Sequence, residues 1–460
     1  MSRNFKVAVI GAGSAGTFAA YELHKQLGDH IDFTVYERKE HAGGRAWNVD
    51  FAGTHVEVGG VLLHSSGKYG YELMDYTGSK EGTPGVSVDG SEETYAFWTS
   101  EGFPVFTKTS LASMALGILR YVGPRSALVV TNAAKDMAKK MEGIYDFQER
   151  GQRFRTTEDI LEACGLLAET RKDLATYLAS KGVNNRMATD IVEPIVHNMY
   201  NQGLELNAFA GLVGLAGAGL AGGYLFSVAG GNWTLFQKAL EKMAVDLRLS
   251  CTVERVDITR DAEGVPTFAV EANDGTADTY DLVILAAPPA LSHIAVTEDG
   301  QEVPIARNPY QPVHTTLVVG DLNPAYFGAP ADKKLPSTIF TADSASAPFK
   351  SVGVTGYSPV HHRRIYKIFS AEHKMTEAEL SEIFLDVADV HEHVWAGAYP
   401  VLNTRVSHVP FEIEPGLYFA NAFETAAGSI EVEAVGGVNA AHLAADYLTE
   451  TALRAWPGRD

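Results

Sequence analysis

Four apolar residues, from Val7 to Ile10, follow one another near the start of the chain. Such a run is typical of a strand that is buried on both faces of a parallel sheet. Residues 17–27 then have the pattern of a helix, and a second short apolar strand follows at residues 33–36. The order strand, helix, strand predicts the beginning of an α/β domain.

Three glycines separate the first strand from the helix. Gly11, Gly13 and Gly16 have the spacing G-x-G-x-x-G, in which the glycines permit a tight turn, close approach of a pyrophosphate and helix–strand packing. Glu37 ends the second strand, where a carboxylate accepts hydrogen bonds from a ribose. The helix N-terminus adds a partial positive charge that favours an anion. The pattern predicts a dinucleotide site and leaves NAD and FAD as alternatives.

The remaining pattern predicts a discontinuous arrangement. Residues 108–200 read as mainly helical, and Thr156 with Asp159 has the spacing of a capping box. Strands are expected at 252–258, 267–272, 280–288, 314–319, 365–370 and 416–421, before a long helix at about 429–449. We therefore predict an α/β fold with a Rossmann-type domain (residues 1–75, 230–290 and 405–460). An α+β substrate domain (76–229 and 291–404) is inserted into it.

Composition narrows the function classes. The net charge of −20 argues against binding to nucleic acid or to anionic lipid. Two isolated cysteines and fifteen histidines without an H-E-x-x-H pattern predict neither a disulfide framework nor a metal site. With no apolar signal segment ahead of the first strand, we expect a cytoplasmic and bacterial protein.

One uncharged stretch, residues 206–237, has the length of a membrane-spanning helix. Eight glycines interrupt it, which disfavours an isolated span. We therefore predict closely packed backbone near a ligand, and no membrane span.

The residues after the second strand resemble a known signature. Glu37-Arg38, four further residues, and then Gly43-Gly44-Arg45 are similar to the E-R-x(4)-G-G-R motif of the FAD-containing amine oxidase superfamily. The segment from Glu57 to Gly60 resembles the acid-x-Gly-Gly segment that these proteins lay against the flavin. The resemblance implies that the cofactor is FAD.

Later segments resemble one branch of this superfamily, the prenylcysteine oxidase (prenylcysteine lyase) family. They are residues 198–203, 207–211, 228–232 and 366–370, together with the closing motif from Tyr418 to Ala441. The resemblance implies these FAD-binding residues: Gly11, Gly13, Ala15, Gly16, Glu37, Arg38, Gly44, Arg45, Gly59, Gly60, Val253, Asn421, Glu424, Ser429 and Ile430.

The family reaction implied by the resemblance is oxidative cleavage of a thioether such as S-prenylcysteine. It yields an aldehyde and a thiol, and O2 is reduced to hydrogen peroxide. A base that activates water would assist it, and His64 and His314 are the candidates, although each also fits a structural histidine. The candidate substrate contacts are Tyr200, Gln202, Phe209, Tyr224 and Phe226, among which the residues of the uncharged stretch fit core packing equally well.

Two alternatives stay open. The first is an amine oxidase or desaturase, with a small amine as substrate. Many amine oxidases place a lysine where Thr315 stands here, and Lys367 offers a substitute from another strand. The second is an FAD-binding protein without catalytic activity, because a fold does not by itself establish a function.

Overall fold

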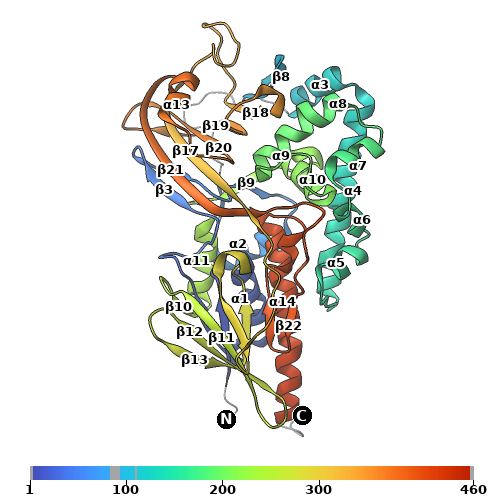
Figure 1. The fold of residues 1–460 in the computed structure, drawn as a ribbon, viewed down its shortest axis with the longest axis vertical. Coiled ribbons are helices and arrows are strands. Elements are labelled where there is room, and N and C mark those ends of the chain that lie inside the picture. Colours follow the sequence, from blue (N-terminus) through green and yellow to red (C-terminus); the bar gives the residue numbers. More distant parts are fainter. Residues whose placement is uncertain (1–3, 83–93, 109–110, 456–460) are drawn as a thin grey trace.

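The computed structural model describes residues 4–82, 94–108 and 111–455. Figure 1 shows three parts: a sheet near both chain ends, a second large sheet, and a group of helices beside it. A long helix, α14 (Ile430–Ala455), runs from the junction of these parts toward the chain ends.

A six-stranded sheet carries the glycine motif. Its order is β10-β2-β1-β14-β23-β22, and all neighbours are parallel except the last pair. The strands are β1 (Phe5–Ile10), β2 (Ile31–Tyr36), β10 (Asp246–Arg248), β14 (Leu282–Leu285), β22 (Glu412–Glu414) and β23 (Leu417–Phe419). All six lie within the segments 1–75, 230–290 and 405–460. Val7 to Ile10 of β1 and all of β14 are buried, which explains their apolar runs, since strands of a parallel sheet are covered on both faces.

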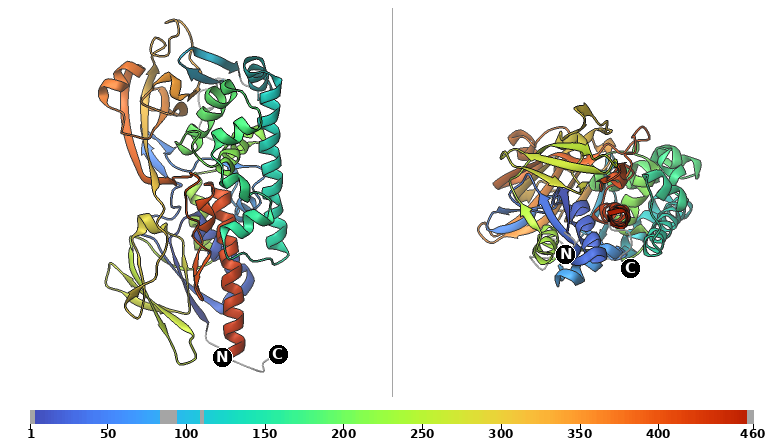
Figure 2. Two further views of the ribbon diagram at one scale, coloured as in Figure 1. Left: turned by 45° about the vertical axis from the view of Figure 1, so that its right-hand side comes forward. Right: turned by 90° about the horizontal axis from the view of Figure 1, so that it is seen from below.

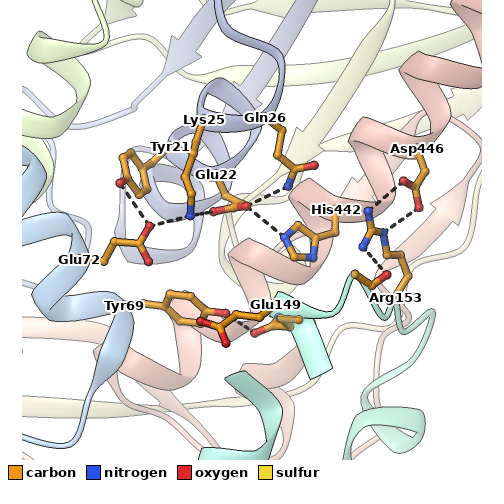
Figure 3. A network of polar contacts seen from close by, with 12 residues as sticks. Tyr21, Glu22, Lys25, Gln26, Tyr69, Glu72, Glu149, Arg153, His442 and Asp446 are labelled. Carbon is orange, nitrogen blue, oxygen red and sulfur yellow. Dashed lines mark hydrogen bonds and ion pairs between the residues drawn. The ribbon is translucent and has the colours of Figure 1, made fainter. Parts of the chain in front are cut away.

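Helix α1 (Ser14–Leu27) packs against α14 on this sheet. Their approach depends on Gly437, because a Cβ there would lie 2.4 Å from the carbonyl oxygen of Ala15. Charged side chains add a second connection at the outer side of α1 (Figure 3). Glu22 accepts hydrogen bonds from Lys25 and Gln26 and meets His442 of α14 at 3.1 Å, while Lys25 reaches Glu72 of α2 (Lys68–Thr77).

A five-stranded sheet, β13-β12-β11-β15-β16, packs beside the first. Its strands are β11 (Val253–Arg260), β12 (Pro266–Ala272), β13 (Ala277–Tyr280), β15 (Ala295–Glu298) and β16 (Gln301–Glu302). The predicted hairpin of 252–258 and 267–272 is confirmed by the pairing of β11 with β12. Strands β15 and β16 continue this sheet beyond the boundary that we predict at residue 290.

The seven-stranded sheet has the order β21-β17-β20-β19-β18-β7-β8. Its strands are β7 (Thr94–Thr99), β8 (Gly102–Lys108), β17 (Tyr310–Leu322), β18 (Thr338–Thr341), β19 (Ser351–Ser358), β20 (Arg363–Ser370) and β21 (Phe384–Pro400). One face packs on the hairpin β3 (Asn48–Phe51) and β4 (Thr54–Glu57) through Val58, Leu317 and Trp395. This packing brings the sheet against the Glu57–Gly60 segment.

The helical part lies beside the seven-stranded sheet, as the two views agree (Figures 1 and 2). It contains α3 (Leu111–Val122), α4 (Pro124–Glu149), α5 (Thr157–Ala163), α6 (Leu167–Thr170), α7 (Leu174–Ser180), α8 (Asn185–Met187), α9 (Glu193–Tyr200) and α10 (Ala208–Leu215). The capping box of Thr156 and Asp159 is confirmed at the start of α5. Within the described ranges, no helix has both the length and the apolar character needed to cross a membrane.

Candidate functional site

The glycine loop forms a backbone cradle at the end of β1. Gly11 has a φ of +116°, which favours glycine, and its N–H donates to the Tyr36 carbonyl oxygen at 2.8 Å. A Cβ on Gly16 would lie 2.0 Å from the Gly11 carbonyl oxygen, so no side chain fits there. Gly13 is the N-cap of α1, and having no side chain it leaves the helix N-terminus open to an external anion.

A second glycine loop faces the first. A Cβ on Gly44 would lie 2.9 Å from the Gly13 Cα, and the Gly43 N–H donates to the Ala12 carbonyl oxygen at 2.9 Å. The E-R-x(4)-G-G-R segment therefore lies directly against G-x-G-x-x-G. Two side-chain-free loops and a helix N-terminus at one place have the chemistry that a pyrophosphate requires.

Glu37 marks one end of this cradle. Its buried carboxylate accepts hydrogen bonds from the N–H groups of Ala12 and Lys39, both at 3.0 Å. The Cys251 N–H donates to the Glu37 carbonyl oxygen at 2.9 Å, so Val253 lies close along the chain. Arg38 instead lies on the surface and donates to the Leu291 carbonyl oxygen.

The start of α14 marks the other end. The Ser14 hydroxyl donates to the Ile430 carbonyl oxygen at 3.1 Å, and the Ser429 hydroxyl caps the Val432 N–H. A Cβ on Gly60 would lie 3.8 Å from Ile430, and one on Gly59 would meet the Arg45 carbonyl oxygen at 2.0 Å. The structure thus brings together predicted cofactor residues from four separate segments.

Arg45 enters a buried ionic cluster. It donates to Glu424, to Glu433 at 3.3 Å and to the Ala398 carbonyl oxygen at 2.9 Å. The Asn421 amide donates to Glu433 at 2.7 Å. Burial and the charge of Glu424 raise the pKa of Glu433 well above its usual range, while the Arg45 guanidinium lowers it.

The cluster has one open acceptor. Asn421 Oδ1 is buried and finds no partner in the part of the chain that the structure describes. Such an atom fits a donor supplied by a bound cofactor. The contacts that Arg45 makes with Glu424 and with the Ala398 carbonyl oxygen fix the backbone around the cofactor site.

The seven-stranded sheet holds the Glu57–Gly60 segment in place. Trp395 Nε1 donates to the Val58 carbonyl oxygen at 2.9 Å, and the Thr315 hydroxyl approaches the same oxygen at 3.3 Å. Lys367 Nζ donates to the Glu57 carbonyl oxygen at 3.1 Å. Burial lowers the pKa of this lysine to about 8.

The two candidate bases are held differently. His64 has both ring nitrogens occupied, Nδ1 by the Ser66 hydroxyl at 2.7 Å and Nε2 by the Gly222 carbonyl oxygen at 2.9 Å. His314 Nδ1 is buried without a hydrogen-bond partner among the described residues. Because Thr315 points toward Val58, strand alternation directs His314 to the opposite face of the sheet.

The five candidate substrate residues do not form one group. Tyr200 is 1% exposed, and its ring meets Tyr399 edge-on at 5.3 Å. A Cβ on Gly428 would lie 3.0 Å from Tyr399, which places this aromatic pair beside the start of α14. The Tyr200 hydroxyl has no hydrogen-bond partner within residues 4–82, 94–108 and 111–455.

Gln202 lies near this pair, because its amide bonds to the backbone of Pro400 and Leu402, which follow Tyr399. The other three lie elsewhere, and Phe209 packs on Phe423. Tyr224, which is 53% exposed, contacts Phe226.

Sequence reasoning missed several residues of the site. Tyr399 and Trp395 come from β21, Glu433 lies on α14, and Tyr310 of β17 donates to Glu424 at 3.0 Å. Asn232, which lies within a quoted family motif, donates to the Gly60 carbonyl oxygen at 2.9 Å. No local sequence pattern marks the remaining residues, Tyr399, Trp395, Glu433 and Tyr310, because they reach the site from segments that are distant in sequence.

Known protein families and individual proteins are similar to this chain over most of its length. The family model described as prenylcysteine lyase matches residues 109–455, and that of an NAD(P)-binding Rossmann-like domain matches residues 9–77. Prenylcysteine oxidase 1-like of Mus musculus is 29% identical over 458 residues, which cover 95% of this chain and 90% of that protein. Farnesylcysteine lyase of Arabidopsis thaliana is 27% identical over 467 residues, with 97% and 89% covered.

Solved structures confirm the predicted fold class. A putrescine oxidase bound to putrescine matches with a TM-score of 0.62 and 17% identity, covering 97% of this chain and 99% of that one. Cyclohexylamine oxidase from Brevibacterium oxydans also has a TM-score of 0.62, with 15% identity and 97% and 100% covered. At these identities the likeness concerns the fold alone. Because the family model spans most of the residues and full-length relatives agree with it, the chain belongs to the prenylcysteine lyase family.

Proposed function

We propose that the protein is an FAD-dependent oxidase that cleaves an apolar thioether of the S-prenylcysteine type to an aldehyde and a thiol, with O2 as electron acceptor. The convergence of four predicted cofactor segments at one site carries the proposal. Two relatives that cover nearly the whole chain are named as a prenylcysteine oxidase and a farnesylcysteine lyase, which supports the thioether as substrate class.

The residues present fit FAD. Glu37 and the nearby Val253 would receive the adenosine, the loops of Gly13 and Gly44 the pyrophosphate, and Gly60 with Ile430 the flavin ring. When bound, FAD supplies the hydride acceptor, which side chains lack. The protein then has to orient the carbon beside sulfur and keep the pocket dry until one water enters.

Tyr399, which is partly exposed and is backed by the buried ring of Tyr200, supplies an apolar surface beside the start of α14, where an isoprenoid chain would pack. For the activation of water we retain His314 and His64 as candidates. His314 has a ring nitrogen without a protein partner among the described residues, but it lies on the strand face opposite to Thr315 and would have to turn toward the flavin. His64 would first have to release Ser66 or Gly222. Each histidine can be replaced by glutamine in turn. Only replacement of the residue that acts as the base should slow turnover while FAD stays bound.

One observation favours a second candidate, an amine oxidase. Lys367 lies on β20 and reaches the Glu57 carbonyl oxygen, on the same face as Thr315. It therefore offers a lysine near the expected flavin ring, as an amine oxidase would require.

The test is anaerobic reduction of the bound flavin. The purified holoprotein is mixed with S-farnesylcysteine, with a short S-alkylcysteine and with a panel of amines, and the absorbance of oxidised flavin is followed. We expect bleaching by the farnesyl thioether and release of aldehyde and thiol when air is admitted. Bleaching by an amine alone would replace our proposal with the second candidate. A flavin that stays oxidised with every compound would indicate a protein that binds FAD without catalysis.

A further inference from the structure

A separate cluster of three side chains lies where the helical part meets the seven-stranded sheet. Glu193 and His197 are one turn apart on α9, so they share one face of the helix. Asp343 begins the short helical turn (Asp343–Ala345) that follows β18. One ligand atom from each residue lies within 4.8 Å of the other two.

His197 points into this cluster from a fully buried position. Only 1% of the residue is exposed, and its Nδ1 lies 2.9 Å from the Thr341 carbonyl oxygen. That contact requires a hydrogen on Nδ1, so the neutral ring directs the lone pair of Nε2 the other way. Nε2 has no hydrogen-bond partner in the described parts of the chain, and it faces Asp343 Oδ1 at 3.6 Å.

Two hydrogen-bond acceptors, His197 Nε2 and Asp343 Oδ1, face each other across 3.6 Å, and a positively charged group between them would stabilise this arrangement. A histidine fixed by a backbone carbonyl at one nitrogen and open at the other has the orientation of metal ligands in proteins. Glu193 adds a second carboxylate, whose Oε2 accepts the Asp343 N–H at 3.1 Å and holds the third residue close.

Lys350 already neutralises part of the negative charge of the two carboxylates. Its ammonium lies 2.6 Å from Asp343 Oδ1, on a side chain that is about a quarter exposed. The Asp343 side chain is 59% exposed, so water reaches the cluster from the same side. With both carboxylates ionised, the cluster carries one negative charge that Lys350 leaves unbalanced, and it is open to solvent at Asp343 and closed by His197.

We propose that Glu193, His197 and Asp343 form a binding site for a divalent transition metal ion, zinc first, with water as the fourth ligand. One imidazole and two carboxylates suit zinc, whereas calcium and magnesium prefer oxygen donors alone. Ligands around a tetrahedral zinc at about 2.0–2.1 Å are about 3.3 Å apart. The observed separations need only small side-chain movements to reach that value.

Such an ion would join α9 to the loop after β18, one turn of helix before Tyr200. It would act as a fixed connection between the helical part and the sheet. This inference is independent of the substrate and of the proposed oxidase activity.

The test is metal binding by the full-length protein in metal-free buffer. Zn²⁺ is titrated calorimetrically, and Co²⁺ is added as a spectroscopic probe, because tetrahedral Co²⁺ has intense visible bands. We compare the wild type with Asp343→Asn, Lys350→Gln and His373→Gln. The last is a matched control, since His373 pairs with Glu379 at 2.8 Å on the surface. Circular dichroism checks that each variant is folded.

We expect one ion per chain for the wild type and the control, and at least tenfold weaker binding for Asp343→Asn. Lys350→Gln should bind at least as tightly as the wild type, because the competing ammonium is gone. Equal affinity of the wild type and Asp343→Asn would overturn the proposal, as would binding lost only in the control. Absence of saturable binding would show that a proton or Lys350 alone balances the cluster.

Discussion

Replacement of Gly13 by valine tests the cofactor site most directly. The residue has φ −84° and ψ −168°, a region that any residue adopts. A Cβ added there meets only Gly44, at 3.4 Å from its Cα, which is an ordinary contact. The folded chain therefore has room for a Cβ at Gly13, whereas a pyrophosphate in the cradle would meet a side chain there.

The expected magnitudes follow from this geometry. Loss of the N-cap glycine alone should lower the free energy of unfolding of the FAD-free protein by no more than about 1 kcal/mol, because alanine and valine are poorer N-cap residues. By contrast, free FAD at 100 times its dissociation constant stabilises a protein that binds it by about 2.7 kcal/mol. We thus expect Gly13→Val to lose bound flavin and its thermal response to added FAD, while it stays folded.

The assay combines the flavin-to-protein absorbance ratio after purification with melting curves in the presence and absence of FAD. Gly143→Ala is the control, because a Cβ on this helical glycine meets nothing within 4 Å in the described structure. It should keep its full flavin content. A Gly13→Val protein that retains stoichiometric FAD would refute the assignment of this loop to the pyrophosphate.

Three further predictions concern stability. Arg45→Met leaves Glu424 buried without its cation, so urea denaturation should show a loss of about 3–5 kcal/mol; an unchanged midpoint would contradict the role of the cluster. Gly437→Ala introduces a Cβ 2.4 Å from the Ala15 carbonyl oxygen, and it should cost about 1–3 kcal/mol in the same assay, whereas Gly143→Ala should not destabilise. Lys367 has a pKa of about 8 in the folded chain, against 10.5 for a free lysine. At pH values between these two, the unfolded chain therefore binds more protons than the folded chain. Wild-type stability should therefore rise with pH across that window. Lys367→Met should be the more stable protein at pH 7 and should lack this rise, and parallel pH profiles of the two proteins would count against a buried charge.

Local patterns predict the parts of the site that are built from contiguous residues. The first glycine loop, its helix and the acid at Glu37 each depend on neighbours in sequence, and the structure places them as expected. The capping box at Thr156 is of the same kind. The apolar run at 282–285 is equally visible, because a strand buried on both faces has few polar residues.

Other parts leave no local signal. Strand β21 lies at the edge of its sheet and carries charged residues such as Asp386, Asp389 and Glu392. Exposed edge strands tolerate such residues, so the alternation that reveals a strand is lost. The residues Tyr399 and Trp395 were therefore missed with their strand.

The cluster of His197 and Asp343 illustrates a different limit. No metal site is expected from the sequence, because its histidines do not form an H-E-x-x-H pattern. Here one histidine has carboxylate neighbours, one from its own helix and one from a loop in the other half of the chain. Only the docking of the helical part on the sheet brings them together.

The order of strands in the six-stranded sheet has a consequence for synthesis of the chain. Strand β1 leaves the ribosome first, yet its neighbour β14 begins at Leu282, and β23 ends only at Phe419. Contacts this distant in sequence are slow to form, and unpaired apolar strands invite aggregation while they wait. One edge of β1 pairs early with β2, whereas its other edge stays without its neighbour until β14 has been made, so this edge is exposed to aggregation for longer.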